Sequence, residues 1–156
     1  MIKVNFDKIN GSVKPLHGIN NGPLSNEAVV DTSIYYKEIG IPFVRLHDTD
    51  WPSFKLVDIP KIFPDFGANP EDPENYFFLE TDEAIEAIIR TGASVLFRLG
   101  TSIEHTRYKR FVVPPKDNVK WAKICIGIIK HYNDGWANGF HYGIKYWEIW
   151  NEPENS

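Results

Sequence analysis

The chain has 156 residues, enough for one domain with a hydrophobic core but fewer than the roughly 250 of a complete (β/α)8 barrel. Its 17 basic and 21 acidic residues give a net charge of −4 without any run of basic residues, so nucleic acid is not an expected partner. The single cysteine, Cys125, excludes a disulfide framework and lies in an apolar helical pattern, where we expect a buried, inert thiol.

No targeting or membrane-spanning segment is visible in the sequence. Met1 is not followed by an apolar signal core, and no apolar run approaches the ~18 residues that a membrane helix needs. We therefore expect no membrane partner. The same absence favours a cytoplasmic location without deciding about export.

The first 13 residues are expected to form a lead-in strand or short hairpin. Ile2, Val4 and Phe6 alternate with polar residues, and Asn10-Gly11 is a turn signal. Residues 14–156 would then form the main domain.

Strand patterns and helix patterns alternate along residues 14–156. We expect strands over 16–20, 41–47, 93–99 and 145–152. The expected helices run over 26–39 after an N-cap at Ser25, from an N-cap at Thr81 to Gly92, and from Asp117 or Asn118 to Asp134-Gly135. This order predicts right-handed βαβ crossovers and a parallel sheet, an α/β fold.

The connecting loops differ in length in a consistent way. The joints from helix to strand at Gly40 and Gly92 are minimal, whereas the loops after the second and third strands, 48–80 and 100–116, are long and rich in aromatic and charged residues. All the long loops therefore follow the carboxyl ends of strands, where parallel sheets bind their ligands.

The last strand carries the most distinctive stretch, KYWEIWNEPE over 145–154. Its aromatic and branched residues favour a strand, which Pro153 would end. By alternation Glu148, Trp150 and Glu152 would share one face, with Asn151 on the other. Glu152 would then lie at the carboxyl end of the strand, where barrel enzymes place their catalytic groups.

Asn-Glu-Pro after an aromatic strand resembles the fourth-strand signature of the clan of retaining glycosidases built on (β/α)8 barrels. Within that clan the run from Pro15 to Glu154 is most similar to glycoside hydrolase family 39, the β-xylosidase and α-L-iduronidase family. The resemblance implies the N-terminal half of a TIM barrel, about four βα units. It also implies a glycoside or oligosaccharide substrate and Glu152 as the general acid/base, which protonates the departing oxygen and later deprotonates water.

The same resemblance implies roles for other residues. Asn151 would bind the sugar 2-hydroxyl, His47 and the adjacent Asp48 would contact substrate, and Arg45 would orient carboxylates. From the residues alone, Arg45 is equally well a core arginine paired with an acid such as Glu148, because a buried charge needs a partner.

Further residues are candidates for substrate binding. Trp51 and Trp150 are suited to stacking on a sugar or to forming a wall of the cavity. Arg98 ends the third strand, and His105 follows it; each would either reach the cleft or support the fold. His17, Asn20 and Asn21 lie at the same end with a weaker claim.

Neither a metal nor a cofactor is expected. The five histidines are scattered without the close spacing of zinc sites, and the sequence has no glycine-rich phosphate loop and no Gly-x-Ser-x-Gly elbow.

Retaining hydrolysis also needs a nucleophilic carboxylate about 5 to 5.5 Å from the acid. Within the resemblance that residue belongs to the seventh strand, beyond this chain. Glu148 cannot replace it on regular geometry, because four residues at ~3.3 Å each separate it from Glu152 by roughly 13 Å. We therefore expect the isolated chain to be catalytically silent and to associate with a missing barrel half or with another copy.

Three alternatives remain open at this point. The first is a noncatalytic carbohydrate-binding module or degenerate barrel. The second is a uronide-directed glycosidase, which would want an extra cation such as Arg98 or Arg107 near the cleft. The third is a self-assembling half-barrel with a structural role.

Overall fold

The computed structural model describes residues 2–25, 30–111 and 113–152. Its strands are β1 (Ile19–Asn20), β2 (Phe43–Leu46), β3 (Ser94–Leu99) and β4 (Tyr146–Ile149). Its α-helices are α1 (Ser33–Ile39), α2 (Ile59–Ile62), α3 (Leu79–Ile89) and α4 (Asn118–Asp134), with short 3-10 turns η1 (Pro73–Asn75) and η2 (Trp136–Asn138). No helix within the described ranges is long and apolar enough to cross a membrane.

The four strands form one parallel sheet in the order β1-β2-β3-β4, which confirms the predicted α/β topology. Arg45 is opposite Leu96, and Arg98 is opposite Glu148, so these four side chains share one face of the sheet. The strands all run in the same direction, and their carboxyl ends therefore meet at one edge of the fold.

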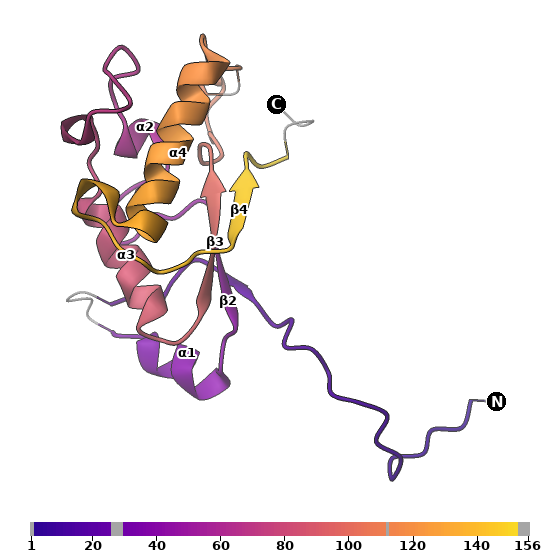
Figure 1. Ribbon diagram of the computed structural model, residues 1–156. Coiled ribbons are helices and arrows are strands. Elements are labelled where there is room, and N and C mark those ends of the chain that lie inside the picture. The colour runs from indigo at the N-terminus through magenta and orange to yellow at the C-terminus, as the bar shows by residue number, and fades with distance from the viewer. Residues whose placement is uncertain (1, 26–29, 112, 153–156) are drawn as a thin grey trace.

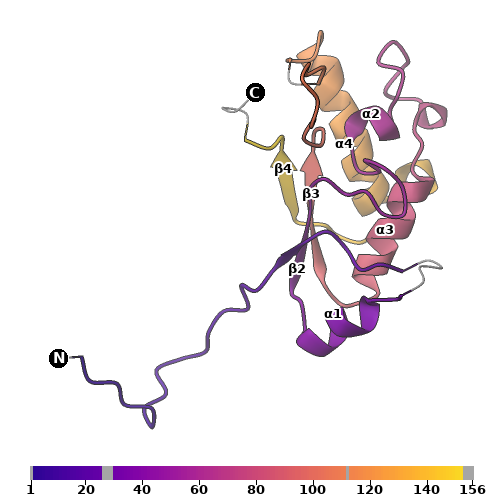
Figure 2. The ribbon, with the colours of Figure 1, turned by 180° about the vertical axis from the view of Figure 1, so that it is seen from behind.

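The helices gather on the other face of the sheet, as both views show (Figures 1 and 2). Val44, Leu46 and Phe97 of the strands are fully buried there, together with Ile88 of α3 and Ile128 of α4. This packing follows from the sequence, because α3 and α4 both carry apolar residues at helical spacing. The face that carries Arg45 and Glu148 has no such cover from the described helices.

The end signals of α4 act as predicted. The Asp117 carboxylate accepts a hydrogen bond from the Lys120 backbone N–H at 2.9 Å, and Gly135 ends the helix with φ +75°. Cys125 is buried within α4, and burial raises the pKa of its thiol to about 12, as expected for an inert cysteine.

The amino-terminal segment differs from the prediction. Residues 2–18 form neither a hairpin nor a strand, and they extend away from the sheet (Figure 1). The first strand begins at Ile19 rather than at residue 16. Alternation alone does not make a strand: it needs a hydrogen-bonded neighbour, which these residues lack in the described part of the chain.

The first helix also begins later than predicted. The expected helix over 26–39 starts at Ser33, with Thr32 as the N-cap residue, and Gly40 ends it as predicted. Residues 26–29 lie outside the described residues. The Asp31 carboxylate accepts a hydrogen bond from the Ser33 N–H at 2.8 Å, a local turn at the start of the helix that helical spacing alone does not reveal.

Helix α3 begins two residues before Thr81, so Thr81 is not the N-cap residue that the sequence predicted. Thr81 lies inside α3, where it is buried and its hydroxyl donates to the Leu56 carbonyl oxygen at 2.5 Å. The N-cap residue is Phe78. A tertiary acceptor therefore decides the role of Thr81, and the loop before it, predicted as irregular, contains α2 and η1.

Candidate functional site

Arg45 lies at the centre of the candidate site, on the uncovered face of the sheet. Its Nε donates to Glu148 Oε2 at 2.7 Å, and its Nη2 donates to Glu148 Oε1 at 2.6 Å. The same Nη2 donates to Asn151 Oδ1 at 2.8 Å. One guanidinium thus joins β2 to β4 and to the residues just beyond β4, and the predicted core pairing of Arg45 with Glu148 is present.

Asn151 points toward Glu148, against the alternation predicted for this stretch. β4 ends at Ile149, and Trp150 and Glu152 have φ of +64° and +44°. Two left-handed residues so close together cannot continue a regular pleat. The prediction that Asn151 and Glu148 lie on opposite faces is therefore wrong, because the strand stops before Asn151.

The charges of this pair stabilise each other. Hydrogen bonds from Arg45 hold the pKa of Glu148 below its ordinary value against the opposing effect of desolvation, with smaller contributions from His47 and Arg98. The hydrogen bonds to Glu148 raise the pKa of Arg45 in turn. Glu148 is therefore an ionised, occupied carboxylate and not a free nucleophile.

Glu152 is exposed and follows the carboxyl end of β4. Its charge contributes to the raised pKa of Arg45, which places it close to the Arg45 and Asn151 cluster. The chain beyond β4 lies at the end to which the arrowheads of β3 and β4 point (Figure 1). This is the end at which a barrel acid/base must lie. Pro153 lies outside the described residues.

His47 and Asp48 follow β2 at the same edge. His47 Nε2 lies 3.5 Å from Asp48 Oδ2, and Nδ1 is buried without a hydrogen-bond partner among the described residues. Asp48 Oδ1 accepts from the Ile103 N–H at 2.8 Å, which ties the loop after β2 to the loop after β3. His47 thus keeps an unused ring nitrogen, whereas one oxygen of Asp48 is already engaged.

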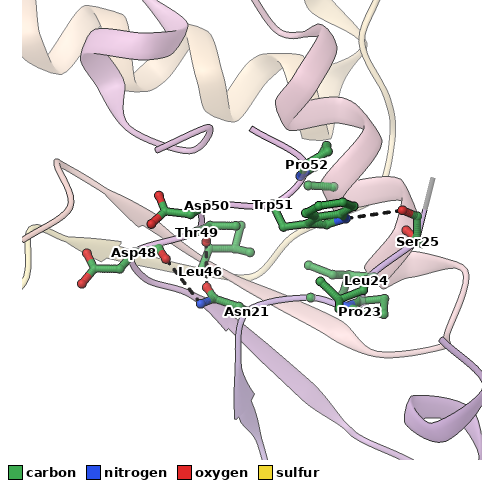
Figure 3. A pocket seen from close by; sticks show the side chains of 13 residues that line it. Asn21, Pro23, Leu24, Ser25, Leu46, Asp48, Thr49, Asp50, Trp51 and Pro52 are labelled. Atoms are coloured by element: carbon green, nitrogen blue, oxygen red, sulfur yellow. Dashed lines mark hydrogen bonds between the residues drawn. The ribbon is translucent and has the colours of Figure 1, made fainter. Parts of the chain in front are cut away.

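A pocket of about 270 Å³ lies beside this edge (Figure 3). Trp51 and Pro52 form one side, Pro23 and Leu24 face them, and the base is apolar. Trp51 is 43% exposed, and its indole N–H donates to the Ser25 carbonyl oxygen at 3.4 Å. An exposed, anchored indole at a pocket mouth is suited to stacking on an apolar sugar face.

Trp150 packs closely on the loop after β3. A Cβ at Gly100 would lie 3.1 Å from the Trp150 ring, and the Trp150 N–H donates to the Leu99 carbonyl oxygen at 2.8 Å. These contacts match the alternative in which Trp150 forms a wall. Its predicted stacking on substrate stays a prediction.

Arg98, predicted to bind substrate, is fully buried and bound within the chain. Its Nη2 donates to Asp58 Oδ1 at 2.8 Å, and Asp58 also accepts from the backbone and hydroxyl of Ser102 at 2.8 Å each. The correction has a simple physical reason: a guanidinium without exposed surface requires a nearby carboxylate, which Asp58 supplies. Arg98 lies on the same face of the sheet as Arg45 but is engaged by Asp58 and exposes no surface to a ligand, which matches the alternative in which it supports the fold.

Two organising residues carried little or no signal in the sequence. Asn21 Oδ1 accepts from Thr49 Oγ1 at 2.7 Å, and Asn21 Nδ2 donates to the Asp48 carbonyl oxygen at 3.5 Å (Figure 3). Asp58 was one acid among several in a long loop. A positive φ at Asn21, tolerated by asparagine, is the kind of local feature that only coordinates reveal.

Within the described ranges, no group of three or more His, Cys, Asp or Glu side chains is arranged to hold a metal ion. The candidate site thus consists of the Arg45 cluster, Glu152, His47 and the Trp51 pocket. Its chemical groups are carboxylates, an amide, an imidazole and aromatic rings. Such groups bind hydroxyl-rich ligands and transfer protons.

No model of a known protein family matches the chain, and no curated protein matches it. A solved structure does: the crystal structure of a glucosidase from Croceicoccus marinus is similar, with a TM-score of 0.68 and 27% sequence identity. The similarity covers 90% of this chain and 29% of that chain. This supports a glycosidase-like fold. The parallel four-stranded sheet is consistent with part of an α/β barrel.

Proposed function

We propose that residues 14–156 are the N-terminal half of the catalytic barrel of a retaining glycoside hydrolase similar to family 39. The proposed substrates are β-xylosides first, and glucosides second because the similar solved structure is a glucosidase. Residues 1–13 are proposed as a lead-in segment outside the barrel. The chain covers less than a third of that glucosidase, so the activity of the whole protein is part of the proposal.

Glu152 is the proposed general acid/base. The observation that carries the proposal is the bond from Arg45 to Asn151, which fixes the residue before Glu152 at the carboxyl edge of the sheet. An exposed carboxyl at that edge can protonate a leaving group held over the sheet and then deprotonate water. Glu148 is excluded from this role because both its oxygens accept from Arg45.

The proposed sugar contacts surround Glu152. Asn151 keeps its amide N–H2 for a sugar hydroxyl, since its bond to Arg45 uses only Oδ1. His47 follows β2 at the same edge, and Trp51 offers a partly exposed ring. The nucleophile and the remaining strands are proposed to come from a second barrel half.

A uronide-directed enzyme is the second proposal for substrate class, and the charges near Glu152 favour it less. Arg98 is paired with buried Asp58 and Arg45 with Glu148, so neither is left for such a substrate. The other candidate cation, Arg107, is exposed in the loop after β3. A neutral sugar at the position of bond cleavage fits these charges better.

The test compares Glu152→Gln with the unchanged protein, in a polypeptide that contains this chain and a second barrel half. Loss of proton transfer should lower hydrolysis of xylosides with poor leaving groups by about 10² to 10⁴-fold. Activated aryl xylosides need less protonation and should lose less. The matched control is Glu83→Gln, an exposed acid of α3, which should leave the rates unchanged.

The 156-residue chain alone should hydrolyse neither aryl xylosides nor aryl glucosides. Turnover by this chain that disappears in Glu152→Gln would contradict the requirement for a second half. Sugar binding without hydrolysis by the longer polypeptide would instead support a noncatalytic carbohydrate-binding barrel.

A further inference from the structure

The loop after β3 carries cations and aromatic rings that the proposed chemistry does not use. Arg107, Lys109 and Arg110 lie close together in it, interleaved with Tyr108 and Phe111. All five residues are exposed. This concentration of positive charge contrasts with the net charge of −4 of the whole chain.

Hydrogen bonds hold the base of this loop in place. The Ser102 N–H and hydroxyl bind Asp58, the Ile103 N–H binds Asp48, and the Ile59 N–H donates to the Gly100 carbonyl oxygen at 2.9 Å. The loop after β3 and the loop after β2 therefore form one connected rim. These hydrogen bonds anchor the loop after β3, whose tip carries the cations.

Glu104, the acid closest in sequence to these cations, is hydrogen-bonded within the loop itself. Its Oε2 accepts from the backbone N–H groups of Arg110 at 2.7 Å and Phe111 at 2.8 Å. The bond from Phe111 is the main cause of the lowered pKa of Glu104, and the charges of Lys55 and Lys109 lower it further. The carboxylate thus shapes the turn, and Lys109 Nζ donates to the Glu104 carbonyl oxygen of the same turn, whereas Arg107 and Arg110 are exposed.

Lys55 belongs to the loop after β2, which the Asp48–Ile103 hydrogen bond ties to the loop after β3, and its ammonium lies beside the exposed Phe54 ring. We call Lys55, Arg107, Lys109 and Arg110 the basic rim. None of the ion pairs between described side chains engages any of the four.

Aromatic rings accompany the basic rim. Arg107 lies over the Tyr108 ring at 5.6 Å, and Lys55 lies over the Phe54 ring at 5.2 Å. Tyr108 is 74% exposed and Phe54 is 67% exposed, so both rings are accessible to a ligand. Cations beside exposed rings suit a ligand that has both anionic groups and apolar ring faces.

We propose that the basic rim binds an anionic polysaccharide, a chain of sugars bearing carboxylates or sulfates, whose neighbouring neutral residue then enters the candidate site. The rim adjoins that site through Asp48, which follows His47 and binds Ile103. This inference rests on the proposed function for the nature of the ligand. Nucleic acid is disfavoured because the chain as a whole has a net charge of −4 and is not a basic domain.

The test measures binding of the chain to soluble polymers by affinity electrophoresis. The polymers are polygalacturonate for carboxylates, dextran sulfate for sulfates, dextran as the neutral polymer and single-stranded DNA as a polyanion without carbohydrate recognition. One or both anionic polysaccharides should bind at least about tenfold more tightly than dextran, and the binding should weaken with salt. The comparison of the two identifies which anionic group the rim prefers.

In the Arg107→Ser/Arg110→Ser variant, the affinity for the anionic polysaccharides should fall by about tenfold and so approach the affinity for dextran. The matched control, Lys37→Ser/Lys130→Ser, removes two exposed cations from α1 and α4 and should bind like the unchanged chain. Tyr108→Ala should weaken binding to the polysaccharides with little effect on its salt dependence.

Equal binding of dextran and the anionic polysaccharides, or equal losses in the two double variants, would overturn the proposal. Binding of DNA as tight as that of the polysaccharides would overturn the assignment to a glycan. These outcomes need no turnover, so they are separate from the Glu152→Gln test of the proposed function.

Discussion

A single guanidinium connects the candidate catalytic stretch to the rest of the sheet. Arg45 binds Glu148 with two hydrogen bonds and Asn151 with a third, so β2 determines where the chain beyond β4 lies. Such two-point contacts are stronger than single ones, because the planar arginine fork matches the carboxylate. The position of the proposed acid/base therefore depends on a residue about one hundred positions earlier in the sequence.

The lowered pKa of Glu148 predicts a dependence of stability on pH. Its stabilising contribution should be complete above the ordinary glutamate pKa and should disappear as the pH falls through the lowered folded-state pKa. At neutral pH the free energy of unfolding of the unchanged chain should be about 1–2 kcal/mol higher than that of the Glu148→Gln variant. The difference is modest because the Arg45 and Glu148 side chains are both partly exposed. Urea unfolding at a series of pH values measures this difference.

The matched variant for this measurement is Arg45→Met. Without the guanidinium, replacing Glu148 by Gln should no longer destabilise the chain at neutral pH. A difference that persists at neutral pH in the Arg45→Met background would argue against the pairing as its cause.

At the scale of elements, a buried ion pair joins the loop after β2 to strand β3. Asp58→Ala leaves Arg98 buried without its carboxylate and should cost about 3–5 kcal/mol of stability. Adding Arg98→Met removes the unpaired charge and should recover a large part of that loss. Equal denaturation midpoints for the single and double variants would contradict this account.

Helix α4 approaches the loop before α3 closely at Gly127. A Cβ there would lie 2.5 Å from Tyr76 Oη and 2.9 Å from its Cζ. Tyr76 is 7% exposed and stacks against Phe78, so it has little room to move. Gly127→Ala should therefore destabilise the chain by about 1–3 kcal/mol, although alanine favours helices by about 1 kcal/mol.

Thermal or urea unfolding measures whether Gly127→Ala lowers or raises the stability of the chain. In a Tyr76→Leu background the added methyl group has space, and Gly127→Ala should become neutral or stabilising. A stabilising Gly127→Ala in the unchanged chain would show that the close approach relaxes at no cost.

At the scale of the whole molecule, the sheet is open at both sides. Among the described residues β1 and β4 each have one neighbouring strand, and Tyr146 of β4, in register with Leu96 on the face without helices, is 49% exposed. Unpaired edges and an exposed apolar face favour association. We predict that the isolated chain self-associates, or binds a second barrel half, in analytical ultracentrifugation.

The control for this experiment places a charge on the open edge. Tyr146→Lys/Ile149→Lys, at two exposed positions of β4, should shift the chain toward monomer. A single monomeric species for the unchanged chain across a wide concentration range would rule out self-association.

The local elements could be predicted where they depend on short-range patterns. The spacing of apolar residues and the turn at Gly135 located α4 closely, and the alternation of strands and helices was enough for a parallel sheet. Thr81 could not be assigned in the same way, because its acceptor, the Leu56 carbonyl, is 25 positions away. For Asn151 the prediction failed because regular alternation was extended past the end of β4.

The sequence by itself determined the order of the elements, the end at which the long loops lie and the residues worth testing there. Each of these depends on composition and on spacing between near neighbours. Only the tertiary structure decided which partners the two arginines take: Arg98 pairs with Asp58, and Arg45, for which the sequence offered Glu148 as one candidate, binds both Glu148 and Asn151. Partners of buried charges are chosen by distance in space, and folding brings together groups whose separation along the chain carries no such information.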